Sequence, residues 1–213
     1  INLTINDGEY IGLIGHTGSG KSTLIQHFNG LLKPSGGSLS VQGIELSAGK
    51  PDLIKLRSKV GLVFQYPEYQ LFEESVAQDI AFGPKNLGLS EAEAAARVSE
   101  AMSLVGLPPE MGEKSPFELS GGQKKRVALA AVVSMNPDIL VLDEPTNGLD
   151  EDSCDIVVNF LLAYVAAGKT VLMSTHHQDL VRRLEARAIY IDRYHHVVEA
   201  PVPSYGTESG AAE

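Results

Sequence analysis

Residues 15–22 form a glycine-rich loop of the pattern G-x-x-x-x-G-K-S, set between a short apolar run and a helical pattern. Glycines let the backbone approach phosphate groups, and the loop amides join the next helix N-terminus in an anion-binding cradle. Because the cradle needs a buried strand before it and a helix after it, the motif favours an α/β fold. It indicates a nucleotide without indicating which one.

The residues of this loop have separate expected roles. Lys21 is expected to reach the β- and γ-phosphates, and the Ser22 hydroxyl is expected to coordinate Mg²⁺. A purely structural glycine loop is disfavoured because strand, loop and helix occur in register. The predicted nucleotide-binding residues are Gly15, His16, Thr17, Gly18, Ser19, Gly20, Lys21, Ser22 and Thr23.

A second motif closes the apolar run of residues 139–142 with the acid pair Asp143 and Glu144. Carboxylates at the carboxyl end of a central strand lie at the mouth of a parallel sheet, where ligands bind. Asp143 is expected to hold Mg²⁺, directly or through water. Glu144 is expected to orient or deprotonate the water that attacks the γ-phosphate. Without the phosphate loop, a pair of helix-capping acids would be the simpler interpretation.

Strand-like and helical patterns alternate along most of the chain, which predicts a mainly parallel sheet. The first two strands are expected to form a hairpin across the turn at residues 6–8. The run that begins at residue 1 needs a neighbour, so a preceding N-terminal strand is also expected. Strands are predicted at residues 1–5, 9–14, 37–46 with a turn at Gly43, 59–64, 139–142, 170–174 and 188–192, and helices at 22–32, 123–134 and 156–165.

The segment of residues 66–118 has a different character and is predicted to be an all-helical insertion. Ser75 and Gln78 form a capping-box pattern, and residues 90–105 carry an amphipathic helical pattern. The expected organisation is one domain over residues 1–199, with a core of residues 1–65 and 119–199. Residues 200–213 are expected to be a flexible tail.

Charge and composition exclude several classes of protein. The 213-residue chain has a net charge of −10, which disfavours tight sequence-independent nucleic-acid binding, so no nucleic-acid partner is expected. No run approaches the ~18 consecutive apolar residues of a membrane span. Its single cysteine, Cys154, cannot form an internal disulfide and is expected to pack in a helix.

Residues 119–123 read Leu-Ser-Gly-Gly-Gln, and with this motif the chain resembles the ATP-binding-cassette (ABC) ATPases. Other motifs of that family follow in the family's order: the phosphate loop, Gln65, the signature at residues 119–123, the acid pair, Asp150 and His176. The resemblance covers roughly residues 1–195. It implies a P-loop NTPase core with a mainly parallel sheet, an antiparallel β subdomain and an inserted helical subdomain.

The resemblance also implies roles for the matching residues. Glu144, Gln65, His176 and Lys21 are expected to be catalytic, and Ser22, Gln65 and Asp143 to bind Mg²⁺ beside ATP. His177 is expected to be a solvated neighbour. In the family, the signature closes on the ATP of a second subunit, in a homodimer or a paralogous heterodimer. The residues expected to contact that second ATP are Leu119, Ser120, Gly121, Gly122, Gln123 and Asp150.

Within the family, residues 63–72 resemble the ATPase subunits of energy-coupling-factor importers, which take up vitamins or transition-metal ions. The resemblance implies a transmembrane partner and a peripheral place on the cytoplasmic face of the cell membrane. The partner is expected to dock near an aromatic cluster, although the same residues could instead form the core of the insertion. The cluster comprises Tyr66, Pro67, Tyr69, Leu71 and Phe72.

Other functions compete with transport. A chromosome-structuring or DNA-repair ATPase is disfavoured because residues 66–119 are too short for its coiled coil and carry no heptads. A translation-factor-type cassette stays open. A GTPase or small-molecule kinase lacks support, since no N-K-x-D motif occurs. The adjacent His195 and His196 have no third ligand nearby and are expected to be surface residues. The family's adenine-stacking aromatic is expected upstream of residue 1.

Overall fold

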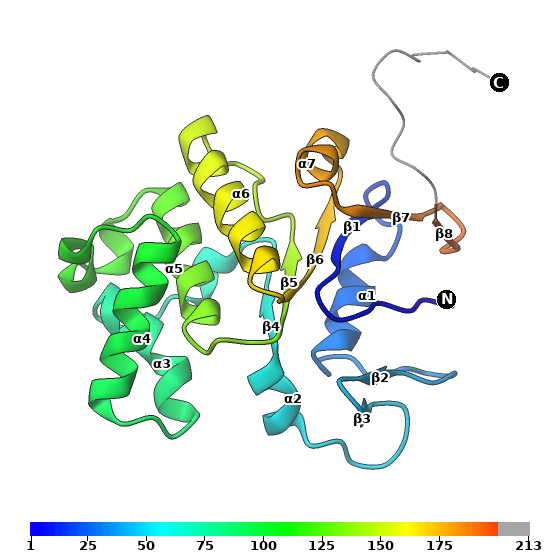
Figure 1. The fold of residues 1–213 in the computed structure, drawn as a ribbon, viewed down its shortest axis with the longest axis horizontal. Helices are drawn as coiled ribbons and strands as arrows, with labels where there is room; N and C mark the ends of the chain where they lie inside the picture. The colour runs from blue at the N-terminus through cyan, green and yellow to red at the C-terminus, as the bar shows by residue number, and fades with distance from the viewer. Residues whose placement is uncertain (200–213) are drawn as a thin grey trace.

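A six-stranded sheet lies at the centre of the computed structural model, which describes residues 1–199 (Figure 1). Its strand order is β4-β5-β6-β1-β7-β8. The first five strands in that order are parallel, and the last is antiparallel to its neighbour. The mainly parallel sheet predicted from the alternation is confirmed. The strands are β1 (Tyr10–Ile14), β4 (Val60–Val63), β5 (Ile139–Asp143), β6 (Thr170–Thr175), β7 (Arg187–Ile191) and β8 (Val197–Glu199).

The central strands are apolar along their length because both faces of the sheet are covered. Alternate residues of β5 show this: Leu140 and Leu142 pack in one core, and Val141 packs in the other. The first core includes α5 (Gly121–Val133), α6 (Glu151–Ala166) and α7 (Gln178–Arg183). The second core includes α1 (Lys21–Phe28) and α2 (Leu53–Lys59). Packing in the second core holds α1 against the sheet, so the helix begins at the end of the phosphate loop.

A separate two-stranded antiparallel sheet joins β2 (Ser40–Val41) to β3 (Ile44–Glu45). The turn between them places Gln42 at φ 50° and Gly43 at φ 74°, both in the left-handed region. Two consecutive residues with positive φ match the twist of a tight hairpin, so the turn predicted at Gly43 is confirmed.

Between β4 and α5 the chain contains only helices, turns and irregular backbone. It forms α3 (Val76–Asn86), α4 (Glu91–Leu104) and three short 3₁₀ turns at Pro67–Gln70, Pro109–Glu113 and Pro116–Glu118. The capping box predicted at Ser75 is present at the start of α3. Figure 1 shows α3, α4 and α5 grouped to one side of the sheet. The subdomain bounds at residues 66–118 stay a prediction.

Three local predictions are wrong. Residues 1–5 form no strand, and no hairpin joins them to β1, because β6 and β7 occupy both edges of β1. The helix predicted to reach residue 32 ends at Phe28, where Gly30 adopts φ 67° and stops it. The short elements α2, α7 and β8 carried too little periodicity to be predicted.

Two remaining expectations concern the chain ends and the membrane. The tail predicted at residues 200–213 lies outside the described residues. Within residues 1–199, every helix is too short or too polar to cross a lipid bilayer.

Candidate functional site

The carboxyl ends of β1, β5 and β6 meet at one edge of the sheet. Their register aligns Ile14 with Thr175 and Asp143 with Ser174. The phosphate loop leaves this edge directly after Ile14. The predicted site residues Lys21, Gln65, Asp143, Glu144 and His176 follow or end strands at this edge, or begin α1 beside it. This is where ligands bind in open parallel sheets.

The phosphate loop turns through two left-handed glycines, Gly18 at φ 84° and Gly20 at φ 97°. Lys21 is 8% exposed, and its Nζ donates to the carbonyl oxygens of Gly15 at 2.6 Å and of His16 at 3.2 Å. The ammonium group therefore lies across the loop, and its charge favours anions there. Ser22 follows in the first turn of α1, whose N-terminal amides add to the cradle.

Asp143 is the last residue of β5 and is only 5% exposed. Its Oδ1 accepts a hydrogen bond from the hydroxyl of Ser174 on the neighbouring strand β6. This bond orients the carboxylate at the strand end. Ser174 is fully buried. From the sequence, Ser174 has no predicted role beyond the end of the strand predicted at residues 170–174. The signal that could have found it is its position two residues before His176.

Glu144 and His176 are in contact although 32 positions separate them in the chain. The imidazole Nδ1 of His176 lies 3.0 Å from Oε1 of Glu144. The Glu144 side chain is 10% exposed and that of His176 is 53% exposed, so the contact joins a buried carboxylate to an imidazole that is open to solvent. His177 stacks beside His176, with ring centroids 4.0 Å apart, and is itself exposed.

Gln65 follows β4 and is half-buried. It lines a small cavity with Glu144, Lys125 and Pro67. The cavity lies between the end of β4 and Glu144, which follows β5. Gln65 and Glu144 thus line the same small cavity.

The signature residues lie on a different element from the phosphate loop. Ser120 is the N-cap of α5, and its hydroxyl accepts from the amide of Gln123 at 3.3 Å. The Gln123 side chain in turn accepts from the Ser120 amide at 3.0 Å. Leu119 is buried beneath this turn, whereas Ser120 and Gly121 are exposed. The exposed face of the signature is therefore available to another molecule.

Asp150 lies close to the signature through the packing of α6 on α5. A Cβ atom at Gly122 would lie 3.3 Å from Oγ of Ser153 in α6. Asp150 caps α6 and accepts from the Ser153 amide at 2.8 Å. This backbone hydrogen bond lowers the pKa of the Asp150 carboxyl. The carboxylate is charged and exposed beside the signature.

The aromatic cluster is split by the structure. Tyr66, Tyr69 and Phe72 are 54%, 85% and 59% exposed, whereas Pro67 and Leu71 are buried. The exposed three are called the aromatic surface below. Pro67 and Leu71 therefore belong to the core of the helical segment, whereas the aromatic surface is free to contact another molecule.

The remaining candidates have structural roles. Cys154 is half-buried against the core, and burial raises the pKa of its thiol. His196 is exposed, and its Nδ1 lies 3.3 Å from Asp192. His195 is not only a surface residue, because its ring reaches the phosphate loop.

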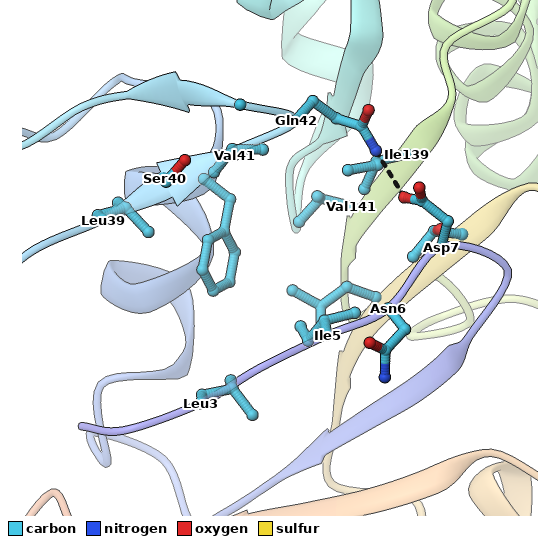
Figure 2. Close-up of a pocket in the computed structure, with 14 residues that line it drawn as sticks. Leu3, Ile5, Asn6, Asp7, Leu39, Ser40, Val41, Gln42, Ile139 and Val141 are labelled. Atoms are coloured by element: carbon cyan, nitrogen blue, oxygen red, sulfur yellow. Dashed lines mark hydrogen bonds between the residues drawn. The ribbon is translucent and has the colours of Figure 1, made fainter.

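A cavity of about 470 Å³ lies at the opposite edge of the sheet (Figure 2). It is lined by Leu3, Ile5, Asn6, Asp7, Phe28, residues 39–43, and Ile139, Val141, Thr170 and Leu172 near the starts of β5 and β6. Asp7 accepts a hydrogen bond from the Gln42 side chain at 2.6 Å across its rim. Because it lies at the amino ends of the strands, this cavity is not part of the candidate site.

Comparison with known proteins gives consistent findings. The sequence matches the family described as ABC transporter over residues 1–147. It is 53% identical, over 91% of this chain and 68% of the relative, to a protein from Caldanaerobacter subterraneus subsp. tengcongensis named energy-coupling factor transporter ATP-binding protein EcfA2. It is 51% identical to the Bacillus subtilis protein of the same name, over 84% of this chain and 66% of the relative.

Two solved structures share the fold. One is a dimeric post-hydrolysis state of the ATP-binding cassette MJ0796 bound to ADP and Pi, with a TM-score of 0.83 and 30% identity. The match covers 93% of this chain and 88% of the MJ0796 chain. The other is cbiO1 from Clostridium perfringens, part of the ABC transporter complex cbiONQ, with a TM-score of 0.79 and 40% identity. It covers 90% of this chain and 76% of its own.

Proposed function

This chain belongs to the ABC transporter family of ATPases, and from that premise we propose that it energises an energy-coupling-factor importer of a vitamin or a transition-metal ion. The names of its relatives favour this function over a translation-factor-type cassette. The observation that carries the chemistry is the contact of Glu144 with His176 at the strand edge where the phosphate loop begins. The contact supports the proposal that Glu144 is a carboxylate base beside the γ-phosphate of a bound nucleotide.

In this proposal, residues 15–23 hold the nucleotide phosphates. The backbone amides of the loop and of the first turn of α1 face the phosphate oxygens, and Lys21 supplies positive charge. Lys21 must exchange its two loop carbonyl partners for phosphate oxygens when ATP binds. The exchange replaces neutral acceptors by charged ones, which make stronger hydrogen bonds to an ammonium group.

The residues at this edge fit a magnesium ion. Ser22, Gln65 and Asp143 offer hydroxyl, amide and carboxylate oxygens, the donor types that Mg²⁺ prefers in proteins. The hydrogen bond from Ser174 fixes the Asp143 carboxylate, as outer groups commonly fix metal ligands. When bound, Mg²⁺ would neutralise charge on the β- and γ-phosphate oxygens.

Hydrolysis needs a water molecule activated beside the γ-phosphate. Glu144 accepts the proton of that water as it attacks phosphorus, and Gln65 orients the water from the adjacent cavity wall. His176 holds Glu144 through Nδ1 and contacts the γ-phosphate with the rest of its ring. The γ-phosphate then leaves as inorganic phosphate and ADP remains on the loop.

A second subunit completes the site. Ser120, Gly121 and the charged Asp150 form an exposed surface at the N-terminus of α5, which suits the nucleotide of a partner cassette. Two cassettes would thus enclose two ATP molecules, each between one phosphate loop and the other signature. A transmembrane subunit docks at the aromatic surface, which holds the dimer peripherally at the cytoplasmic face of the cell membrane.

The decisive variant is Glu144→Gln. Removing one positioned base is expected to lower ATP turnover by ~10²–10⁴-fold, while calorimetry finds ATP affinity retained. Because ATP then persists, the variant is expected to be dimeric in Mg-ATP by light scattering and monomeric without nucleotide. Wild-type turnover in this variant would contradict the assignment of the base.

A matched control is Glu185→Gln. Glu185 is also a glutamate in the left-handed region, at φ 48°, but it is exposed after α7, away from the strand edge. Its variant is expected to hydrolyse ATP at the wild-type rate. Lys21→Ala is expected to lose ATP binding itself, and an unchanged affinity there would contradict the proposed cradle.

A further inference from the structure

The end of β7 and the turn that follows it contact the phosphate loop at two places. A Cβ atom at Gly15 would lie 2.7 Å from the carbonyl oxygen of Ile191, the last residue of β7. At the second place, within the loop, Nδ1 of His195 lies 2.8 Å from the carbonyl oxygen of Ser19. These contacts join segments that are 176 positions apart in the sequence.

The direction of the His195 contact follows from its partner. A carbonyl oxygen only accepts, so Nδ1 of His195 carries the hydrogen and donates it. A Cβ atom at Gly20 would lie 3.5 Å from the same nitrogen, so the ring lies beside the Ser19–Gly20 peptide. Ser19 is 1% exposed, and within residues 1–199 its hydroxyl has no hydrogen-bond partner. The side-chain hydrogen bond that holds this peptide therefore comes from His195 and not from the Ser19 hydroxyl.

The turn that presents His195 is itself well fixed. The Asp192 carboxylate accepts from the amides of Tyr194 and His196, both at 2.8 Å. The Asp192 amide donates to the His196 carbonyl at 3.0 Å, and the His195 amide donates to the Asp192 carbonyl at 3.1 Å. His195 sits at φ 64°, the left-handed conformation that aims its ring at the loop. A rigid turn can hold a flexible loop in place.

We propose that His195 is a positioning residue for the phosphate loop, one that holds the Ser19–Gly20 peptide ready for phosphate before a nucleotide arrives. Gly18 and Gly20 leave the loop many alternative conformations. A hydrogen bond from outside the loop removes some of them, so less ordering remains to be done on binding. This inference rests on the proposed role of residues 15–23 as the cradle. His195 itself touches no phosphate.

Two substitutions at this position separate the hydrogen bond from the backbone. Asparagine places an amide Nδ2 where histidine has Nδ1, and both asparagine and glycine tolerate the left-handed conformation. His195→Asn therefore keeps the donor, and His195→Gly removes it. His196→Ala is the matched control, since it removes the other imidazole of the same turn. For each variant of the full chain, calorimetry measures the affinity for ATP and for inorganic tripolyphosphate. The midpoint of thermal unfolding is measured as well.

His195→Gly is expected to bind both ATP and tripolyphosphate about two- to tenfold more weakly, as for one lost hydrogen bond. His195→Asn is expected to restore the affinity, and His196→Ala to leave it unchanged. Wild-type affinity in His195→Gly would overturn the inference, and so would a failure of asparagine to rescue. An equal loss in His196→Ala would overturn it by assigning the effect to the turn as a whole.

The two ligands and Lys21→Ala distinguish this inference from the proposed function. A loss for ATP alone would place His195 at the nucleoside and overturn the role at the phosphates. Tripolyphosphate binding that survives Lys21→Ala would refute the cradle itself. Loss of binding in Lys21→Ala with wild-type binding in His195→Gly would refute only the role of His195.

Discussion

At the scale of single residues, the backbone of Glu144 departs from the strand that precedes it. Its φ of 51° lies in the left-handed region, which non-glycine residues seldom occupy. Its amide donates to the Ser174 carbonyl at 3.1 Å, so the neighbouring strand holds this conformation. The turn directs the carboxylate towards His176. Strained residues held by their surroundings are typical of functional sites.

Gly15 has a different constraint, because no side chain fits there. A Cβ atom would lie 2.6 Å from Ser19 Oγ and 2.7 Å from the Ile191 carbonyl oxygen. Gly15→Ala must displace either the loop or β7, which is expected to cost about 1–3 kcal/mol of stability, as overpacking does. Chemical denaturation measures the free energy of unfolding, and calorimetry is expected to find weaker ATP binding.

The control for this prediction is Gly36→Ala. Nothing lies within 4 Å of a Cβ atom at Gly36, so that variant is expected to match the wild type in both measurements. Equal stability of Gly15→Ala and Gly36→Ala would show that the close approach at Gly15 relaxes without cost.

At the scale of elements, three helices begin with the same capping box. Ser75 with Gln78 starts α3, Ser90 with Glu93 starts α4, and Ser120 with Gln123 starts α5. In each box the serine hydroxyl accepts from an amide of the first turn and so satisfies a group that the helix leaves unpaired. Only the capping box of α5 has a proposed second role, which is to contact the nucleotide bound to a partner cassette.

Ser90→Ala and Ser120→Ala test whether that second role exists. Each variant is expected to lose about 1 kcal/mol of unfolding free energy, because each removes one N-cap hydroxyl. Ser90→Ala is expected to keep wild-type ATP turnover. Ser120→Ala is expected to lower turnover at temperatures where both variants are fully folded, since in the proposed dimer its hydroxyl faces the second nucleotide. Chemical denaturation and a steady-state ATPase assay measure the two effects.

The comparison between the two variants decides the result. If Ser120→Ala retained the turnover of Ser90→Ala at equal stability, the hydroxyl would be a helix cap and nothing more. The trans contact of the signature would then depend on its glycine amides alone.

At the scale of the whole molecule, the helical segment presents the aromatic surface, while the candidate phosphate site lies at the sheet edge. Phe72 packs edge-on against Phe82 of α3, with ring centroids 4.9 Å apart. Asp79 of the same helix accepts from the amides of Phe72 and Glu73, at 3.1 and 3.2 Å. These contacts join the segment after Gln65 to α3. The aromatic surface is therefore fixed to α3 at Phe72, seven residues after Gln65.

Tyr69→Ala combined with Phe72→Ala tests the docking proposal. Both side chains are largely exposed, so the variant is expected to fold and to hydrolyse ATP in solution as the wild type does. Loss of the aromatic contact area is expected to uncouple hydrolysis from transport in the assembled complex. Substrate uptake by reconstituted vesicles, measured beside ATP turnover, checks this.

Ile54→Ala is the control for an exposed apolar residue elsewhere, since Ile54 is 81% exposed on α2. It is expected to leave uptake unchanged. If the double variant instead lost soluble ATPase activity but still assembled, the aromatic surface would be part of the insertion's packing.

Local patterns in the sequence predicted most of the elements and named the residues of the candidate site. The phosphate loop between an apolar run and a helix, the acid pair ending another run, and the capping boxes depend on neighbours only a few residues away. Such short-range patterns can be recognised in the sequence without knowledge of the fold. They also place each candidate residue at a strand or helix end, and the register of a parallel sheet brings strand ends together.

Contacts between distant segments were decided by the tertiary structure alone. Residues 1–5 have a strand pattern, but β6 and β7 already occupy the edges of β1, and a strand has only two edges. The aromatic cluster reads as uniformly apolar, yet packing buries Pro67 and Leu71 and exposes Tyr69. His195 is exposed, as predicted, but only the tertiary structure brings its ring to the carbonyl oxygen of Ser19. Sequence patterns determine what each segment can form, whereas competition for strand edges, buried volume and hydrogen-bond partners determines where it lies.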